Sequence, residues 1–263
     1  MYILGIETSC DDTAAAVIEA KGGLAKSSFS ILANTSHSQV AIHKKFGGIV
    51  PNLASRAHLE KIIPTIKEAF RVAKTKPDKI DLIAVTRGPG LIPSLLIGVN
   101  TARALSYKWQ KPIIGVNHIE GHIYSNWLPP IGKILNLKSQ KKIEFPALIL
   151  VVSGGHTELV LMSNYGKYKI IGQTLDDAAG EAFDKTARLL GLGFPGGPVI
   201  AAMANQLKTK NYQLKTKLPR PMINSKDYNF SFSGLKTAVL YLYNDLVKKY
   251  PKEKIIPAMA AEV

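Results

Sequence analysis

Apolar runs broken by short polar loops recur along the chain, and two segments follow the same pattern. In each, an apolar run leads into a loop of small polar residues, and a second apolar run follows. This pattern predicts a β-hairpin whose tip offers backbone N–H groups and hydroxyls. The runs are residues 2–6 and 14–18 around the loop 7–13, and residues 147–152 and 159–162 around the loop 153–157. One such hairpin near the start of each half predicts two related domains.

Helical and strand patterns alternate in the rest of the chain. Residues 53–73 carry apolar side chains at helical spacing, and Pro64 within them predicts a kink or a break. Further strands are expected at 29–33, 81–86 and 113–116, and further helices at 94–109, 176–190, 198–207 and 233–248, the last with Ser233 as its N-cap. This alternation predicts an α/β fold with a mixed sheet in each half. We expect domains at 1–112 and 113–263, with the loop 129–144 as the alternative boundary.

The charge of the chain is strongly positive. Lys and Arg outnumber Asp and Glu by 34 to 19, which gives a net charge of +15 and a pI near 9.7. This excess favours a polyanionic partner such as nucleic acid, although generic solubility explains it as well. The Lys-rich run 207–220 is typical of a solvated face, and a nucleic-acid contact is the alternative.

The sequence predicts a cytoplasmic protein. The lone Cys10 cannot form an internal disulfide, which fits a reducing compartment. The first residues lack the pattern of a signal or transit peptide. The apolar run 147–152 is far shorter than the ~20 residues that span a bilayer, so we expect no membrane association.

His118 and His122 form the most specific chemical feature of the chain. Four residues apart on a helix, they share one face with Cβ atoms roughly 5–6 Å apart, so both can bind one divalent metal ion. The alternative is a pair of solvated surface histidines. Glu120 lies about 200° around the helix from each of them, so the geometry disfavours a peptidase of the His-Glu-x-x-His type.

The second predicted hairpin has the composition of a phosphate-binding loop. Ser153, Gly154 and Gly155 combine a hydroxyl, several N–H donors and little side-chain bulk. No Gly-Lys-Ser/Thr follows, so this is not a Walker A loop. Taken alone, this composition favours a simple hairpin turn.

Several acidic residues have suggestive positions. Asp11 and Asp12 lie at the tip of the first hairpin, where a carboxylate could hold Mg²⁺ or accept a proton. Asp176 and Asp177 fall in the first turn of a predicted helix, where the helix dipole favours them. Asp184 lies two turns further along and needs another explanation, such as hydrogen bonds to a ribose.

A series of motifs resembles the bacterial-type TsaD family of tRNA threonylcarbamoyladenosine synthases. It includes Gly-Ile-Glu-Thr-Ser-Cys-Asp at 5–11, Val-Asn-His-Ile-Glu-Gly-His at 116–122 and Val-Val-Ser-Gly-Gly-His-Thr at 151–157. Residues 47–58, 88–91, 176–185 and 230–237 complete the series, in the order of the family. The resemblance implies a two-domain actin-like ATPase fold of the sugar kinase and Hsp70 type, in which the two hairpins are phosphate loops.

The resemblance also implies a reaction and its residues. A threonylcarbamoyl group would pass from threonylcarbamoyl-AMP to N6 of the adenosine beside the anticodon in tRNAs that read ANN codons. His118 and His122 would hold iron or zinc, and Asp11 would act near the reacting centre as general base. The substrate-binding positions of the family match Val151, Val152, Ser153, Gly154, Gly155, Asp184 and Gly197. The nucleotide would be threonylcarbamoyl-AMP or ATP, the latter with or without Mg²⁺. The partners would be tRNA, a smaller paralogous subunit and a separate ATPase.

Two features depart from the family pattern. Pro93 stands where the family usually has glycine, a minor change of the backbone. The family also continues beyond the position of Val263 with a second nucleotide loop and an aspartate that completes the metal site. We therefore expect the chain as it stands to be weak or inactive in transfer. A small-molecule kinase of the actin-like superfamily and a catalytically inactive scaffold remain the alternatives.

Overall fold

The computed structural model describes residues 1–22, 28–128, 131, 143–207 and 218–263. The chain divides into two compact units, Met1–Ile143 and Glu144–Val263. Most of the basic loop 129–144 and of the Lys-rich run 207–220 lies outside the described residues. Among the helices that the structure describes, none has the length and apolar character needed to cross a bilayer.

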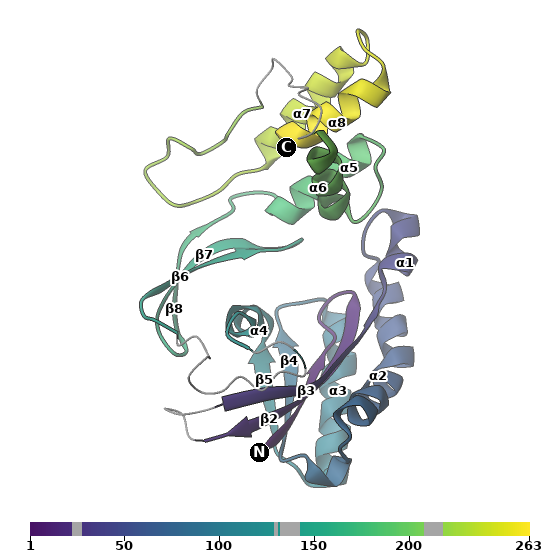
Figure 1. Cartoon of the computed structure of the whole chain (residues 1–263), viewed down its shortest axis with the longest axis vertical. Helices are drawn as coiled ribbons and strands as arrows, with labels where there is room; N and C mark the ends of the chain where they lie inside the picture. The colour runs from purple at the N-terminus through teal and green to yellow at the C-terminus, as the bar shows by residue number, and fades with distance from the viewer. Residues whose placement is uncertain (23–27, 129–130, 132–142, 208–217) are drawn as a thin grey trace. The chain divides into compact units, whose positions relative to one another are not determined.

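The first unit is built on a five-stranded sheet in the order β3-β2-β1-β4-β5 (Figure 1). Neighbours in the β3-β2-β1 half are antiparallel, whereas β1, β4 and β5 are parallel. The sheet is therefore mixed, and the α/β class is confirmed. The strands are β1 (Tyr2–Glu7), β2 (Asp12–Lys21), β3 (Ser28–Ser38), β4 (Leu82–Gly88) and β5 (Ile113–Asn117).

Two long helices, α2 (Pro51–Ala73) and α3 (Ile92–Trp109), cover one face of this sheet. Their apolar faces pack on the strands in one core that includes the buried side chains of Leu4, Ile62 and Ile83. α2 runs unbroken through Pro64, since buried residues on both sides of the proline anchor the helix to the sheet. The shorter elements are α1 (Val40–His43), α4 (His118–Ser125) and the 3-10 turns η2 (Lys44–Phe46) and η3 (Pro77–Lys79).

Pro93 lies in the first turn of α3, which is a position that accepts proline. The N–H groups of a first turn have no partner within the helix, so proline removes no hydrogen bond there. This departure from the family pattern leaves the helix intact.

The division between the two compact units follows residue 143, whereas the sequence led us to expect the boundary at 112/113. The strand β5 pairs in parallel with β4, from Ile113 opposite Ile83 to Asn117 opposite Gly88. A boundary after residue 112 would separate this edge strand from its sheet. The observed division falls in the alternative region, 129–144.

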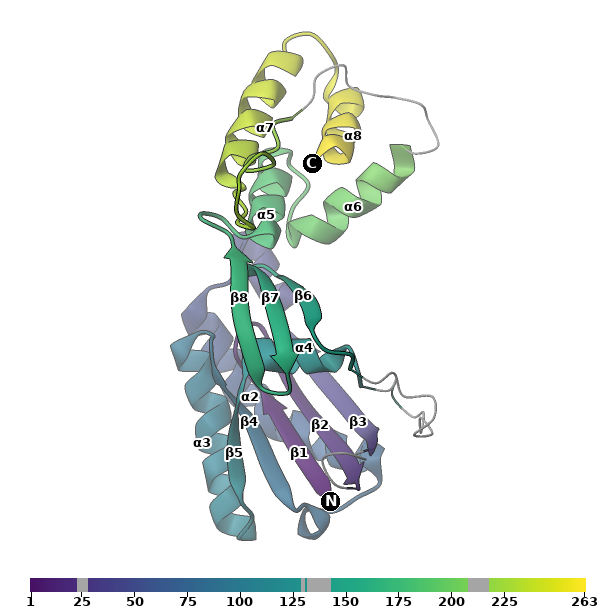
Figure 2. The ribbon, with the colours of Figure 1, turned by 90° about the vertical axis from the view of Figure 1, so that its left-hand side faces the viewer.

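The second unit combines a small sheet with four helices (Figure 2). The strands β6 (Ala147–Val152), β7 (Thr157–Asn164) and β8 (Lys167–Gln173) are antiparallel, so the mixed sheet expected in each half is seen in the first unit but not among the described strands of the second. The described helices of this unit are α5 (Ala179–Leu189), α6 (Gly196–Leu207), α7 (Ser233–Leu246) and α8 (Lys252–Glu262). Their apolar core includes Leu190, Val239, Ile255 and Met259.

Candidate metal and nucleotide sites

The loop that follows β1 is held in place by the turn before α3 and by α3 itself. The Leu91 N–H donates to the Ser9 carbonyl at 2.8 Å, and the Thr8 hydroxyl donates to the Ser94 carbonyl at 2.9 Å. Gly98 permits this approach, because a Cβ at that position would lie 2.3 Å from Thr8 Oγ1. The loop is therefore a packed element of the first unit.

His58 of α2 holds the same loop from the helix that covers the sheet. The side chain is completely buried, with Nε2 3.1 Å from the Cys10 carbonyl and Nδ1 2.8 Å from the Thr13 hydroxyl. A carbonyl can only accept, so Nε2 carries the proton and Nδ1 accepts from Thr13. Burial lowers the pKa of His58, which favours this neutral form. The sequence analysis missed this role, although Ala54 and Ile62, four residues away on either side, are buried on the same face.

Asp11, the predicted general base, lies in this loop immediately before β2. It is half-buried, and its carbonyl accepts from the Gln39 N–H at 3.0 Å, which ties the loop to the end of β3. Burial, together with the neighbouring Asp11 carboxylate, raises the pKa of the Cys10 thiol to about 12. Cys10 is thus a protonated, unreactive thiol at neutral pH. The neighbouring Asp12 is exposed and begins β2.

His118 and His122 lie on α4, as the sequence predicts. Asn117 caps the helix, and its side chain accepts from the N–H groups of Ile119 at 2.8 Å and Glu120 at 3.1 Å. The two histidine Nε2 atoms are 3.2 Å apart, and the ring planes are nearly perpendicular, at 86°. The helix thus turns both nitrogens toward one point.

This spacing fits a shared metal ion. Two nitrogens 3.2 Å apart and each at about 2.0–2.1 Å from one ion would subtend an angle of roughly 100° there, close to the tetrahedral value. Among the described residues, no group of three or more His, Cys, Asp or Glu side chains is arranged to hold a metal. The pair therefore supplies two ligands of a candidate site.

Glu7, at the end of β1, connects the first hairpin to the histidine pair. Its Oε2 lies 3.2 Å from His118 Nδ1 and accepts from the Thr86 hydroxyl of β4, while its Oε1 accepts from the Ser9 N–H. Burial alone would raise the pKa of Glu7, but hydrogen bonds from His118, Ser9 and Thr86 outweigh it and lower the pKa to about 2. Glu7 was not predicted as a site residue, because Thr86 and His118 are distant from it along the chain.

The predicted phosphate loop forms the tip of the β6–β7 hairpin. Ser153 Oγ accepts from the N–H groups of Gly155 at 3.3 Å and His156 at 3.0 Å, which closes a tight turn. A Cβ at Gly154 or Gly155 would meet no atom within 4 Å. These glycines therefore leave open space beside the loop backbone. Of the two valines that precede the loop, Val151 is buried and Val152 is exposed.

The helix α5 brings the remaining nucleotide candidates together. Its Gly180 N–H donates to the Ser153 carbonyl at 3.1 Å, so the helix begins against the phosphate loop. About one turn on, Asp184 Oδ1 accepts from the Gly196 N–H at 2.7 Å, at the start of α6. Gly197 is the next residue of α6. One Asp184 oxygen thus fixes the start of a helix, while its predicted bond to a ribose stays a prediction.

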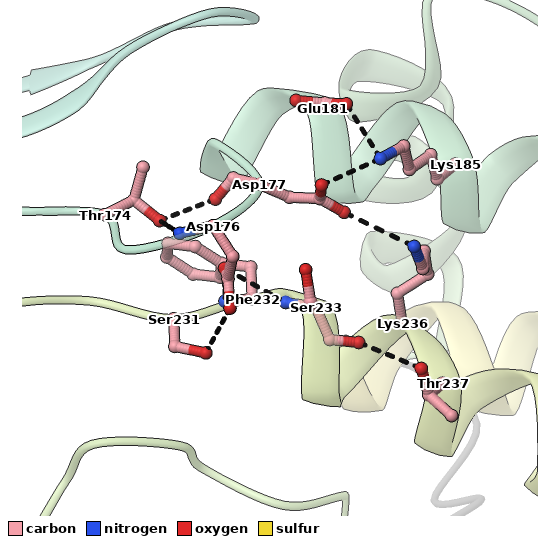
Figure 3. Close-up of polar contacts among 10 residues, drawn as sticks. All are labelled: Thr174, Asp176, Asp177, Glu181, Lys185, Ser231, Phe232, Ser233, Lys236 and Thr237. Carbon is pink, nitrogen blue, oxygen red and sulfur yellow. Dashed lines mark hydrogen bonds and ion pairs between the residues drawn. The ribbon is translucent and has the colours of Figure 1, made fainter.

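Asp176 organises the start of α7 (Figure 3). Its Oδ1 accepts from the N–H groups of Phe232 at 2.7 Å and Ser233 at 3.2 Å, and its Oδ2 accepts from the Ser231 hydroxyl at 2.6 Å. Burial opposes ionisation, but these hydrogen bonds outweigh it and lower the pKa of Asp176. The expected N-cap at Ser233 is wrong, because α7 already includes Ser233 and the distant carboxylate binds its first N–H groups.

Asp177 lies beside Asp176 and joins two lysines. Lys185 Nζ is 2.8 Å from Asp177 Oδ1 and 2.7 Å from Glu181, and Lys236 Nζ is 3.6 Å from Asp177 Oδ2 (Figure 3). Because α5 begins at Ala179, neither aspartate is in its first turn, and the expected helix-dipole role is wrong for both. They instead attach α7 to α5.

A family model and the curated relatives agree on one family. Residues 30–261 match the family model TsaD, tRNA N6-adenosine threonylcarbamoyltransferase. Proteins of that name from Thermomicrobium roseum and Bacillus subtilis are 52% and 50% identical over 91% and 95% of the chain, which spans 61% and 65% of their lengths. Among solved structures, YeaZ from Pseudomonas aeruginosa matches 65% of each chain with 11% identity and a TM-score of 0.37. An Aquifex aeolicus Ppx/GppA family member matches 99% of this chain and 88% of its own, with 12% identity and a TM-score of 0.36.

Proposed function

The chain belongs to the TsaD family of tRNA N6-adenosine threonylcarbamoyltransferases, and on this basis we propose that it transfers a threonylcarbamoyl group to N6 of an adenosine in tRNA. One observation carries the proposal. The family match covers the histidine pair, the second hairpin loop, Asp184 and Gly197, so it includes the residues that would bind metal and nucleotide. The donor would be threonylcarbamoyl-AMP, and the acceptor the adenosine beside the anticodon in tRNAs that read ANN codons.

The first unit would provide the metal ligands and the general base. His118 and His122 would hold iron or zinc through the two Nε2 atoms that lie 3.2 Å apart. The bound ion would supply positive charge to stabilise oxygen atoms of threonylcarbamoyl-AMP. Asp11 would accept the proton from the adenosine N6, and the contacts of His58 would keep the Asp11 loop in position.

The second unit would bind the nucleotide. The open space beside Gly154 and Gly155 allows a phosphate or sugar to approach the backbone of the loop closely. Gly197 lies in the first turn of α6, where helix N–H groups favour an anion. The remaining oxygen of Asp184 would bind the ribose. The ligand would be threonylcarbamoyl-AMP or ATP, the latter with Mg²⁺.

The transfer would exchange one bond for another. The N6 nitrogen would attack the carbamoyl carbon and form a new C–N bond, while the C–O bond to the AMP phosphate breaks. AMP would leave with the bonding electrons, and the N6 proton would pass to Asp11.

The positive charge of the chain supports tRNA as the substrate. A net charge of +15 would attract the phosphate backbone whatever its sequence. We further propose a cytoplasmic complex with a smaller paralogous subunit and a separate ATPase.

A transfer assay tests this function directly. The chain, loaded with Zn²⁺ or Fe²⁺, would be incubated with threonylcarbamoyl-AMP and tRNA, and the digested tRNA would be analysed by mass spectrometry for threonylcarbamoyladenosine. We expect only weak product formation from the chain as it stands, and at least about 100-fold less from Asp11→Asn, because general-base catalysis typically contributes 10²–10⁴-fold. Glu120→Gln is a matched control on α4 and should retain activity.

A phosphotransfer assay with the wild type and His118→Ala discriminates between the transferase and the kinase alternative. A kinase would transfer phosphate from ATP to a small molecule without tRNA, and His118→Ala would leave that rate unchanged. Such a result would refute the transferase proposal.

A further inference from the structure

Glu7 has an environment that fixes the direction of every hydrogen bond it makes. The Ser9 N–H and the Thr86 hydroxyl both donate to its carboxylate, and an ionised carboxylate can only accept. Its contact with His118 Nδ1, at 3.2 Å, must therefore be a bond that the imidazole donates. The Ser9 hydroxyl, 3.1 Å from the same nitrogen, is a second polar neighbour on that side of the ring.

This direction determines the tautomer of His118. A neutral imidazole carries one N–H proton, and a proton on Nδ1 leaves the lone pair on Nε2. The Nε2 atom is the one that faces His122, 3.2 Å away. His118 thus presents a lone pair toward the proposed metal position before any metal binds.

We propose that Glu7 is a positioning residue for metal binding, which holds His118 in the tautomer and ring orientation that coordinate the ion through Nε2. This inference rests on the proposed function, since it assumes the metal site on α4. Carboxylates behind ligating histidines serve this purpose in other metal sites, and their loss typically lowers metal affinity by about 10- to 100-fold. Glu7 itself does not touch the metal.

The two histidines of the pair are consequently unequal. In the metal-free protein, the lone pair of His118 Nε2 can accept a hydrogen bond from His122 Nε2 at 3.2 Å. His122 must then move its proton to Nδ1 before it can bind a metal, whereas His118 needs no such change. Metal entry would therefore rearrange His122 around a fixed His118.

The tautomer can be measured without any metal or Glu7 variant. Long-range ¹H–¹⁵N spectra distinguish a protonated imidazole nitrogen from a lone-pair nitrogen, and His118→Ala identifies the signal among the six histidines of the chain. We expect His118 to be protonated on Nδ1 at neutral pH. Protonation on Nε2 alone would overturn the proposal, whatever the stability of the variants.

Metal titration tests the consequence for affinity. In Glu7→Gln, the side-chain amide presents a donor to Thr86 or His118, which favours the wrong imidazole tautomer. We expect the affinity for Zn²⁺, measured by competition with a chromophoric chelator, to fall about 10- to 100-fold. Glu68→Gln is the matched control, because it removes the same charge from an exposed ion pair on α2 and should leave the affinity unchanged.

The outcomes separate this inference from the function on which it rests. Unchanged Zn²⁺ affinity in Glu7→Gln, with clear loss in His118→Ala, would refute the role of Glu7 and leave the metal site standing. Unchanged affinity in His118→Ala would refute the metal site itself, and the inference with it.

Discussion

The two hairpins follow one sequence pattern, yet the structure surrounds them differently. The strand β1 is central in its sheet, between β2 and β4, and its loop is held by α2 and α3. Among the described strands, β6 pairs only with β7, and its loop is held by the start of α5. Glycines near the first loop permit close packing, whereas Gly154 and Gly155 leave open space. The same local pattern therefore supports a rigid site in one unit and an accessible one in the other.

The largest difference in unfolding free energy should appear between substitutions in β1 and substitutions in β6. Leu4 of β1 is fully buried, whereas Leu150 of β6 is 57% exposed. We expect Leu4→Ala to lower the free energy of unfolding by about 3 kcal/mol through lost burial and a cavity. Leu150→Ala should change it by less than about 0.5 kcal/mol. Urea unfolding of both variants measures the two values, and equal losses would contradict the comparison.

Substitution of Gly98 and of Gly154 should give the next largest difference in unfolding free energy. Gly98→Ala places a Cβ 2.3 Å from Thr8 Oγ1 and forces the Thr8 hydroxyl away from the Ser94 carbonyl. We expect a loss of about 2 kcal/mol in unfolding free energy, as for other overpacked positions. Gly154→Ala should cost less than about 0.5 kcal/mol but weaken binding of a threonylcarbamoyl-adenylate analogue in calorimetry. If Gly154→Ala left binding intact, the loop would be only a turn.

Removal of the Asp176 carboxylate tests how the second unit is held together. Asp176→Ala leaves the first N–H groups of α7 without their acceptor, so we expect a loss of about 1 kcal/mol in unfolding free energy, similar to the loss of a helix cap. Hydrogen exchange should accelerate at Phe232 and Ser233 and stay unchanged at β1. Asp245→Ala, which removes an exposed carboxylate on α7 from an ion pair with Lys248, is the control for changes of charge.

The smallest effect is a pH dependence that belongs to the first loop. The folded pKa of His58 lies below its unfolded value of 6.5, so the unfolded chain binds the proton more readily. The stability that this adds is present above pH 6.5 and is lost as the pH falls toward the folded pKa. Denaturant unfolding at pH 7.5 and 5.5 should show this loss in the wild type and a smaller one in His58→Gln. An identical loss in both would assign it to other groups.

Local patterns predicted the elements whose neighbours in sequence determine them. Both hairpins appear within three residues of the expected bounds, and the predicted helix 53–73 corresponds to α2. The unit boundary falls in the alternative region 129–144 rather than at 112/113, because the pairing of β5 with β4 depends on sheet topology rather than on any local signal.

The candidate site was predictable only where its residues form a short motif. The spacing of His118 and His122 was enough to place them together. Glu7 escaped prediction because its partner His118 lies 111 residues away. The role of Asp176 was predicted wrongly for the same reason. The N–H groups that it binds belong to Phe232 and Ser233, which lie 56 and 57 positions further along the chain.

The exposed side chains of β6 have a practical consequence for work with this chain. Leu148, Leu150 and Val152 form an apolar row on a strand at the edge of the described sheet. Such an edge can pair with a strand of another molecule, and the apolar row would reinforce that pairing. The chain should therefore self-associate as its concentration rises. Leu150→Lys should restore a monomer in light scattering without a loss of stability.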